Sequence, residues 1–296
     1  MSVKTNSKHN KTIENTAAEQ LYDGGQGDYD ILHALYRSED NLGMHYGFWE
    51  TDTKSIWEAQ QNENEYVSHK LSLTTSDLVL DAGCGIGGTA IPLAKKYQYH
   101  IHGITISEVQ VNRATEYAEK IHIDSLVTFS HQDFHHTNFR NDHFNKIYSV
   151  ESANYANPPR RYLKEMHRIL QKSGRLLVVD AYLTKPLDHF SEKERKVLDT
   201  FCLAWCIPNP QTVDHWLIEA KKVGFKKIQV EDLLHKILPS APKFGMLAQV
   251  MRPFYEIGFH LGLLSKVRYD NMVAARLQQE LFEQGVLGYH SLLMTK

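Results

Sequence analysis

The chain has 296 residues, and its 33 lysines and arginines nearly balance its 35 aspartates and glutamates, for a formal net charge of −2. This balance leaves no basic excess to neutralise phosphates, so a nucleic-acid partner is not expected. No stretch approaches the roughly 18 consecutive apolar residues of a transmembrane segment. The polar start predicts no signal peptide, and the three cysteines favour a reducing cytoplasm.

The N-terminal part of the chain is expected to form a helical segment ahead of the main domain. Residues 1–11 predict a disordered tail, because they are polar and have almost nothing to bury. Residues 12–74 predict a helical N-terminal lid, which the glycines between 24 and 27 interrupt. Its expected elements are short helices at 12–22 and 29–37, a loop rich in glycine and aromatic residues at 41–50, and a helix at 53–73.

From residue 75 onward, short apolar runs alternate with helical patterns. This alternation predicts an α/β fold with a Rossmann-like, doubly wound and mostly parallel sheet. The expected strands are 78–80, 99–104, 126–130, 144–150, 175–181, 225–230 and 285–294, seven in all. The expected helices are 89–97, 107–121, 160–170, 191–206, 212–223 and 269–284, with a turn at 172–174 and broken helices over 233–264.

A glycine-rich turn follows the first of these strands. Asp81 is followed by Gly83, Gly85, Gly87 and Gly88, and a helix begins directly afterwards. Glycines at such a turn let the backbone approach a ligand closely, and the helix N-terminus adds N–H donors. The spacing fits both the dinucleotide pattern G-x-G-x-x-G and the pattern D-x-G-x-G-x-G of S-adenosylmethionine (SAM) methyltransferases.

The end of the second strand helps to separate the two ligands. A dinucleotide site requires an acidic residue about 20 residues after the turn, to bind the ribose hydroxyls. Here the strand ends in Thr105, Ile106 and Ser107, and Glu108 already belongs to the next helix. The dehydrogenase interpretation is therefore weaker, and a glycine turn without any ligand is the third alternative.

Three later segments, taken with the glycine turn, give the chain a recognisable resemblance. These segments are Gly-Ile-Thr-Ile-Ser-Glu-Val-Gln at 103–110, Gln-Asp-Phe at 132–134 and Leu-Ala-Trp-Cys at 203–206. The chain resembles class I SAM-dependent methyltransferases, above all the sterol and γ-tocopherol C-methyltransferase group and related natural-product methyltransferases. The resemblance runs from about residue 22 to the C-terminus. It implies a SAM-binding domain over 75–296, with helical substrate-side insertions at 183–216 and 233–268, and S-adenosylhomocysteine as product.

The resemblance also implies a set of cofactor-binding residues. Asp81 would hold the ammonium group of SAM through a charge-assisted contact, Asp133 would accept from the adenine, and Gln110 would bind the ribose or complete a helix capping box with Ser107. Tyr22 and Tyr46 would belong to the lid. The full set is Tyr22, Tyr46, Asp81, Gly83, Cys84, Gly85, Gly87, Thr105, Ile106, Gln110, Gln132, Asp133 and Phe134.

The motif after the fourth strand carries the candidates for chemistry. Tyr155 stands where many members of the group have histidine. Because tyrosine has a pKa of about 10, it is a poor base and is expected to orient the acceptor or to form an aromatic wall. Glu151 is expected to hold the methionine part of SAM or to take a proton. Cyclopropane-fatty-acid synthases are disfavoured, since they place a bicarbonate-binding carboxylate where this chain has Asn154.

The expected acceptor is a small hydrophobic molecule, because the irregular segments are rich in aromatic residues. Its candidate contacts are Phe48, Trp49, Trp205, Trp216 and Phe254. The expected reaction is C-methylation of an isoprenoid or of a prenylated or sterol-like acceptor, in which aromatic rings would stabilise a carbocation. The alternatives are N- or O-methylation of a natural product or amine, and SAM binding without methyl transfer. No metal is assigned, and the sequence leaves the oligomeric state open, a homo-oligomer included.

Overall fold

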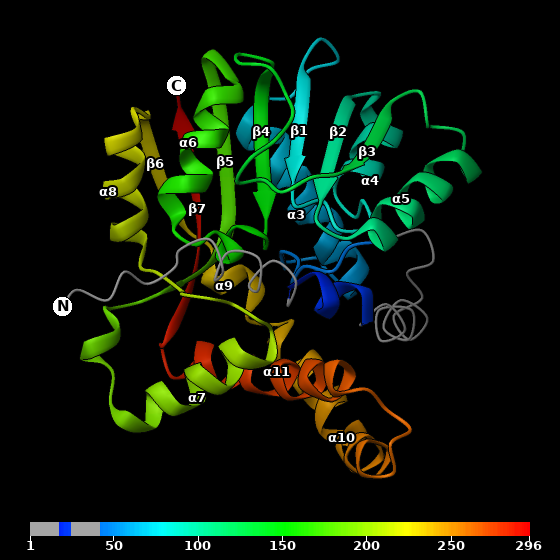
Figure 1. The fold of residues 1–296 in the computed structure, drawn as a ribbon, viewed down its shortest axis with the longest axis vertical. Helices are drawn as coiled ribbons and strands as arrows, with labels where there is room; N and C mark the ends of the chain where they lie inside the picture. The colour runs from blue at the N-terminus through cyan, green and yellow to red at the C-terminus, as the bar shows by residue number, and fades with distance from the viewer. Residues whose placement is uncertain (1–17, 25–41) are drawn as a thin grey trace, which may run out of the picture.

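The computed structural model describes residues 18–24 and 42–296. Its centre is a seven-stranded sheet in the order β3-β2-β1-β4-β5-β7-β6, drawn in Figure 1. Only β7 runs antiparallel to its neighbours, β5 and β6, whereas the other paired strands are parallel. The strands are β1 (Leu78–Ala82), β2 (His100–Thr105), β3 (Val127–His131), β4 (Phe144–Val150), β5 (Leu170–Leu183), β6 (Lys226–Asp232) and β7 (Leu287–Thr295). The predicted Rossmann-like α/β class is confirmed.

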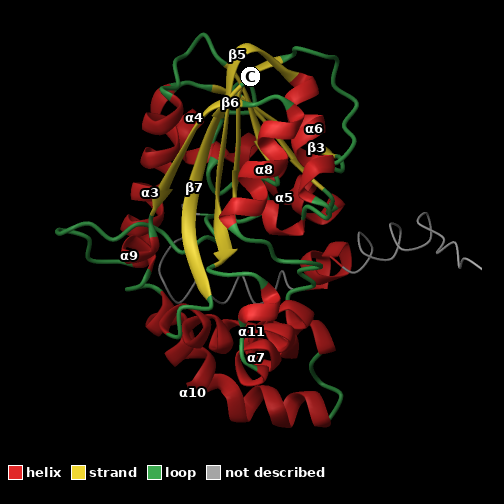
Figure 2. Cartoon of the chain, turned by 90° about the vertical axis from the view of Figure 1, so that its left-hand side faces the viewer, coloured by secondary structure: helices red, strands yellow, loops and turns green. Residues whose placement is uncertain are grey.

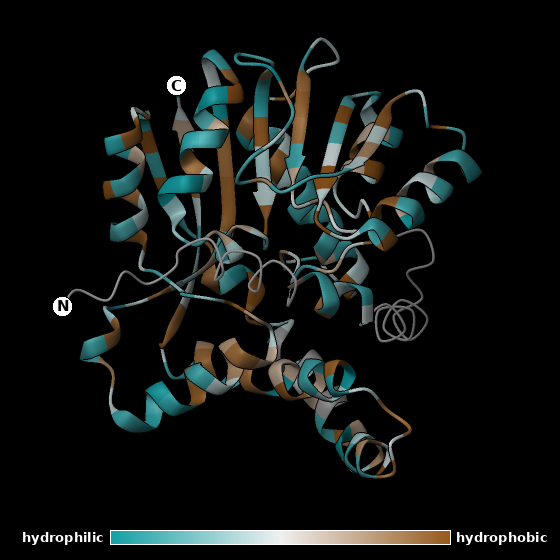
Figure 3. Cartoon of the chain, viewed as in Figure 1, coloured by the Kyte–Doolittle hydropathy of each residue, from teal (hydrophilic) through white to brown (hydrophobic). Residues whose placement is uncertain are grey.

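Helices cover both faces of the sheet because alternate strand residues point to opposite sides. In β5, Leu177 and Val179 pack with residues of α3 and α4, whereas Leu176 and Val178 pack with residues of α6 and α8. Figure 3 shows hydrophobic colour along much of β5, which lies inside the sheet. These helices are α3 (Ile56–Leu71), α4 (Ala90–Tyr97), α5 (Glu108–Lys120), α6 (Pro159–Ile169) and α8 (Val213–Val223).

A third group of helices lies beyond the carboxyl ends of the parallel strands, as Figures 1 and 2 show. It comprises α7 (Glu192–Ala204), α10 (Ala241–His260) and α11 (Lys266–Glu283), and the short α9 (Leu234–Ile237) packs on β7 nearby. Here α11 packs on α7 and β7, and α10 packs on α11. Ligands of open α/β sheets bind at the carboxyl ends of the strands, so this helical group adjoins the region where a site is expected.

Several predicted boundaries differ from the structure. The expected turn at 172–174 belongs to β5, whose pairing with β4 shifts between Leu170 and Arg175 while Ser173 adopts a positive φ of 63°. Pro253 lies inside a continuous α10, so the expected breaks over 233–264 reduce to the gap between α9 and α10. Residues 18–22 are helical, as predicted, but the helix continues through Asp23 and Gly24, where the break was expected to begin. The expected elements at 1–11 and 29–37 lie outside the described residues.

Among residues 18–24 and 42–296, no helix combines the length and the apolar character that crossing a bilayer requires.

Candidate active site

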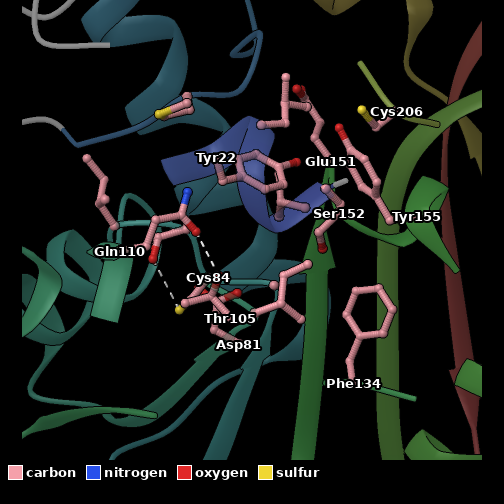
Figure 4. A pocket seen from close by; sticks show the side chains of 18 of the residues that line it. Tyr22, Asp81, Cys84, Thr105, Gln110, Phe134, Glu151, Ser152, Tyr155 and Cys206 are labelled. Atoms are coloured by element: carbon pink, nitrogen blue, oxygen red, sulfur yellow. Dashed lines mark hydrogen bonds between the residues drawn. The ribbon is translucent and has the colours of Figure 1, made fainter. Parts of the chain in front are cut away.

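A cavity of about 280 Å³ lies at the carboxyl ends of the parallel strands, and Figure 4 shows part of its lining. All of the predicted cofactor-binding residues except Tyr46 and Gly87 lie on its wall. Residues far apart in the sequence complete the wall, from the helix at 18–24 to Ala275 of α11. The glycine turn, the end of β2 and the motif after β4 therefore meet around one space.

The glycines of the turn serve different purposes. Gly83, Gly85 and Gly87 all have positive φ, at 96°, 54° and 87°. A Cβ on Gly83 would lie 2.4 Å from the Ser152 side chain, and one on Gly87 would lie 2.7 Å from Ile91. A Cβ on Gly85 would meet nothing within 4 Å. Gly83 and Gly87 thus permit close packing within the protein, whereas Gly85 leaves open space on the cavity side.

Asp81 is the penultimate residue of β1 and is almost completely buried on the cavity wall. Burial raises the pKa of its carboxyl group to about 7, although the Tyr148 hydroxyl partly offsets this effect. Within the described part of the chain, no lysine or arginine forms a salt bridge with Asp81. A buried carboxylate without a cationic partner is unfavourable, so the site suits a ligand that brings its own positive charge, such as the ammonium group of SAM.

The wall at the end of β2 combines a helix cap with a polar side chain. Ser107 Oγ accepts from the Gln110 backbone N–H at 3.1 Å, and Thr105 Oγ1 donates to Gln110 Oε1 at 2.7 Å. The Gln110 side chain does not complete a capping box, because it turns to Thr105 at the cavity, as Figure 4 shows. Ile106 and the buried Cys84 supply apolar surface beside it.

The segment after β3 forms the far end of the wall. Asp133 Oδ1 accepts from the His135 backbone N–H at 2.8 Å and pairs with His135 Nδ1 at 2.7 Å. Phe134 packs edge-on against Tyr162, with 5.2 Å between the ring centroids. Both ends of the Gln132 amide are hydrogen-bonded to neighbouring residues. This segment is therefore held firmly where the sequence predicts the adenine to bind.

A smaller cavity of about 60 Å³ adjoins the first one. Glu151, Tyr155 and Trp205 lie on the walls of both cavities. Tyr46 lines the smaller cavity rather than the larger, which corrects its expected position, and its hydroxyl donates to Gln278 Oε1 at 2.6 Å. The reason is that the backbone of Tyr46 runs along Glu151, so its ring points toward α11 and β7.

Tyr155 ends a short 3-10 turn, Ala153–Tyr155, that follows β4. Its hydroxyl donates to the Trp205 carbonyl oxygen at 2.9 Å, and its ring packs edge-on against Tyr22 with centroids 5.7 Å apart. Figure 4 shows both rings beside the cavity. The geometry therefore presents Tyr155 to the cavity as an aromatic surface, because its hydroxyl hydrogen is already engaged.

Glu151 follows β4 in a left-handed conformation, with φ of 48°. Its Oε1 accepts from the Tyr46 backbone N–H at 2.9 Å and lies 2.8 Å from the Tyr289 hydroxyl oxygen. Burial, followed by the nearby Glu63 carboxylate, holds the pKa of Glu151 well above its usual range. Burial therefore favours the protonated form of Glu151, and a protonated carboxyl group cannot act as a base.

A second buried acid lies on the smaller cavity. Asp180 on β5 accepts from the Asn154 backbone N–H at 3.0 Å, and the Asn154 side-chain amide donates to its other oxygen. Burial raises the pKa of Asp180 to about 7. Asp180 and Asn154 add polar groups to the lining of this cavity, and Leu198 and Phe201 add apolar side chains.

Three predicted acceptor residues lie away from both cavities. Phe48 is 1% exposed and packs edge-on against Tyr66. The indole Nε1 of Trp49 donates to Ser240 Oγ at 2.7 Å. Trp216 is 2% exposed in the core beneath α8, because its apolar ring faces the sheet. These positions correct the sequence-based expectation, and of the five candidates Trp205 remains on the cavity wall.

The described part of the predicted substrate-side insertion at 233–268 lies away from both cavities in the structure. Phe254 on α10 is 67% exposed, and no described residue of 233–268 lies on either wall. The physical reason is the layering, since α10 packs on α11 and is thereby kept away from the strand ends. Asn271 and Ala275 of α11 line the larger cavity instead.

Sequence reasoning missed several other wall residues. His45 comes from the loop before α3, Ser152 follows Glu151, and Arg161 comes from α6. The aromatic loop at 41–50 was a usable signal for His45, since that segment was expected near the acceptor. No comparable local pattern marks Arg161 or the α11 residues. Among the described residues, no group of histidine, cysteine, aspartate and glutamate side chains could hold a metal ion.

Comparison with known proteins gives the site a context. The family model described as mycolic acid cyclopropane synthetase matches residues 16–237. Methyltransferase GfsG of Streptomyces halstedii is 27% identical over 231 residues, which cover 77% of this chain and 82% of that protein. Sterol 24-C-methyltransferase of Kluyveromyces lactis is 25% identical over 227 residues, which cover 76% of this chain and 61% of that protein.

Solved structures show the same fold at lower identity. The cyclopropane synthase MmaA2 from Mycobacterium tuberculosis aligns with a TM-score of 0.76 and 18% identity, covering 93% of this chain and 98% of that one. The [4+2]-cyclase SpnF aligns with a TM-score of 0.74 and 22% identity over 94% and 95%. A geranyl diphosphate methyltransferase with bound substrate and sinefungin aligns with a TM-score of 0.73 and 17% identity over 95% and 99%.

Proposed function

Because the chain belongs to the mycolic acid cyclopropane synthetase family and is a SAM-dependent methyltransferase, we propose that it methylates a carbon atom of a lipophilic, alkene-bearing acceptor of the isoprenoid type. The observation that carries this proposal is the aromatic wall of the larger cavity. Tyr22, Tyr155 and Trp205 converge there from three separate segments. Methylation of an alkene creates a carbocation, and aromatic faces stabilise cations.

The residues around the glycine turn fit SAM. In this proposal Asp81 holds the ammonium group, Thr105 and Gln110 lie along the ribose, and Asp133 accepts from the adenine. The open side of Gly85 leaves room for the ligand backbone, and the uncompensated burial of Asp81 favours a cationic ligand. When bound, SAM supplies a methyl group that its sulfonium charge has already activated. The protein then has to align the acceptor and exclude water.

The smaller cavity is proposed to hold part of the acceptor. Leu198 and Phe201 give it apolar surface, and it joins the larger cavity along Glu151 and Tyr155. Relatives named as sterol 24-C-methyltransferases and neighbours named as geranyl diphosphate methyltransferases support an acceptor with a double bond. This chain spans about three fifths of the sterol enzymes, so a sterol itself is one candidate among several.

A second candidate is N-methylation of an amine. The observation in its favour is the pair of buried carboxyl groups, Glu151 and Asp180, on the smaller cavity. Ionised carboxylates would attract an ammonium group, but the raised pKa of each makes the pair less anionic at neutral pH. This chemistry favours a neutral acceptor.

The test is turnover of purified protein with SAM that carries a fully deuterated methyl group. The acceptors are isoprenoid diphosphates, sterols with a side-chain double bond, prenylated phenols, unsaturated fatty acyl chains and small amines. C-methylation with proton loss from the acceptor skeleton retains all of the deuterium in the product, whereas cyclopropane formation loses one deuterium. Mass spectrometry and NMR of the product identify the atom. Turnover confined to amines, or no turnover at all, would refute the proposal.

The described N-terminal segments are proposed to close over SAM. The helix at 18–24 is joined to α5 through Asp23, which accepts from Ser107 Oγ, and residues 42–45 pass over the turn at Gly88. Because SAM must reach an enclosed site, these contacts are expected to open and close. Hydrogen exchange at 18–24 and 42–48 should slow when SAM is added. Equal exchange with and without SAM would contradict a SAM-linked lid.

A further inference from the structure

Two buried histidines on the wall of the larger cavity, His45 and His135, have an Nε2 atom without a hydrogen-bond partner among the described residues. His135 lies in the segment proposed to bind the adenine, so His45 is the candidate for chemistry. His45 comes from the loop before α3 and is 6% exposed. Its Nδ1 lies 2.7 Å from Glu63 Oε2, whereas its Nε2 is buried and has no hydrogen-bond partner among the described residues. An unsatisfied polar atom in such a position is unfavourable unless a ligand uses it. Because His45 lies on the wall of the larger cavity, a ligand bound there is the candidate partner for this nitrogen.

Glu63 fixes the protonation of this imidazole. The carboxylate is fully buried on α3, and its Oε2 also accepts from the Gly47 backbone N–H at 2.9 Å. Its Oε1 accepts from the Tyr289 hydroxyl at 2.9 Å. The 2.7 Å contact between His45 Nδ1 and Glu63 Oε2 needs a hydrogen between the two atoms, and an N–H on Nδ1 supplies it. In this tautomer the lone pair of Nε2 is available.

The Tyr289 hydroxyl links the His45–Glu63 pair to the motif after β4. Tyr289 lies 2.9 Å from Glu63 Oε1 and 2.8 Å from Glu151 Oε1, yet it has a single hydrogen to donate. One of the two carboxyl groups must therefore be protonated. Burial and the Glu63 charge raise the pKa of Glu151, which favours this proton on Glu151. Glu151 is thereby removed as a base, and His45, next to the Tyr46 N–H that binds Glu151, takes its place on the wall.

We propose that His45 is the base that accepts the proton released when the acceptor is methylated, and that Glu63 is its positioning residue. The proposal rests on the proposed function. The acceptor's π electrons form the new carbon–carbon bond to the methyl group as the carbon–sulfur bond breaks with its electron pair on sulfur. A C–H bond beside the cationic carbon then breaks, its electrons restore the double bond, and the proton passes to His45 Nε2. The Glu63 carboxylate stabilises the resulting imidazolium.

Other titratable groups must be separated from His45 in any test. Glu63 contacts His45, Tyr289 links Glu63 to Glu151, and the cavity wall adds Asp81, Asp133 and His135. Asp81 titrates near neutral pH, but its proposed effect is on SAM binding. Measuring kcat at saturating SAM therefore isolates the proton acceptor from the cofactor site.

The decisive variant is His45→Asn, which retains an N–H donor for Glu63 and loses the basic nitrogen. At saturating SAM, kcat is expected to fall by about 10²–10⁴-fold, while calorimetric SAM affinity stays within about threefold of wild type. The matched control is His69→Asn, an exposed histidine on α3, which should leave both quantities unchanged. Wild-type kcat in His45→Asn would overturn the proposal, and so would a parallel loss of SAM affinity and kcat, which would make His45 a cofactor contact.

Glu63→Gln tests the positioning role. Its kcat should fall less than that of His45→Asn, and the acidic limb of kcat against pH should move to lower pH, because an amide stabilises imidazolium less than a carboxylate does. Glu63→Asp should restore part of the rate. Nitrogen-15 NMR of the ligand-free protein gives a reading independent of turnover, with the His45 proton expected on Nδ1. A proton on Nε2 would overturn the assignment.

The failure of this inference is distinguishable from the failure of the proposed function. If the wild-type enzyme methylates none of the acceptors, the proposed function is refuted and the base with it. If the wild-type enzyme is active and His45→Asn is equally active, the base alone is refuted.

Discussion

The two walls of the cavity are built in different ways. The wall proposed to bind SAM, the cofactor wall, comes largely from residues 81–89, with the ends of β2 and β3 beside it. The wall proposed to bind the acceptor, the acceptor wall, collects residues from 18–24, 42–45, 150–155, 205–208 and α11. In this proposal, the ligand shared by the family contacts a compact local motif, whereas the variable ligand contacts segments that meet only in the folded chain. The first wall can therefore be read from the sequence and the second requires the structure.

The walls also differ in how their acids are satisfied. Asp81 on the cofactor wall has no cationic partner within the described residues, so its burial is left for a ligand to offset. On the acceptor wall, Glu151 is joined to Glu63 through Tyr289, and Glu63 is joined to His45. The first arrangement suits binding of a cation, and the second suits transfer of a proton.

The largest expected effect separates glycines within the cofactor wall itself. Gly83→Ala should destabilise the protein by about 2–5 kcal/mol, because its Cβ would overlap the Ser152 side chain at a positive φ. Gly85→Ala should lower stability by only about 1–2 kcal/mol, the strain of its left-handed backbone, since its Cβ meets no protein atom within 4 Å. Thermal unfolding measures both changes.

For Gly85, the expected effect on SAM affinity is larger than the expected effect on stability. Gly85→Ala should weaken SAM binding in calorimetry while the protein stays folded, because the added methyl group enters the open side of the turn. A Gly85→Ala protein that binds SAM as tightly as wild type would show that the ligand does not approach this residue.

The second effect concerns the uncompensated acid of the cofactor wall. Asp81→Asn should weaken SAM binding by about 1.5–3 kcal/mol, the value of a hydrogen bond to a charged group. The binding-competent carboxylate is lost as pH falls below about 7, so wild-type affinity should decline in that range by up to about tenfold per pH unit. The asparagine variant should show a flat profile. A wild-type affinity that is constant between pH 5.5 and 8, roughly one unit or more on either side of neutrality, would contradict this role.

Without SAM, the contribution of Asp81 to stability should fall as pH rises, whereas its contribution to SAM affinity should grow. The folded-state pKa of Asp81 is raised from 3.8 to about 7, so the folded protein binds more protons than the unfolded chain between these values. The contribution of this group to stability therefore falls as pH rises through that window. In thermal melts, Asp81→Asn should be more stable than wild type at a pH above 7, and the difference should shrink under mildly acidic conditions.

The fold and the cofactor wall could be predicted because their signals are local. The alternation of strands and helices gave the sheet, and the glycine turn with the Thr105–Gln110 segment led to the residues that line the larger cavity. Gly87 is the instructive exception, since its glycine is required by packing against Ile91 rather than by the cavity. A motif identifies which residues gather, and the packing decides what each of them contacts.

The acceptor wall could not be predicted because aromatic residues have no local mark that separates core from cavity. Trp205 and Trp216 have the same side chain, yet Trp205 lines both cavities and Trp216 is buried beneath α8. His45 could not be predicted either, because its proposed role as a base depends on a contact with Glu63, which lies 18 residues away in the sequence. Such pairs arise from tertiary contacts.

The smallest expected effect tests the aromatic surface of the acceptor wall. Tyr155→Phe keeps the ring and loses one hydrogen bond, from the hydroxyl to the Trp205 carbonyl oxygen. A neutral hydrogen bond contributes about 1 kcal/mol, so kcat should fall no more than about fivefold. Tyr155→Ala removes the ring as well, and the loss of a cation–π contribution of about 2 kcal/mol corresponds to about thirtyfold in rate.

The comparison of these two variants decides what Tyr155 does. A phenylalanine variant much more active than the alanine variant supports an aromatic wall beside a developing cation, with the proton taken elsewhere. A phenylalanine variant as impaired as alanine would mean that the hydroxyl, despite its bond to Trp205, takes part in proton transfer or orients a heteroatom acceptor. Because SAM is bound by the opposite wall, calorimetric SAM affinity should be nearly the same in both variants, and kcat at saturating SAM is the quantity to compare.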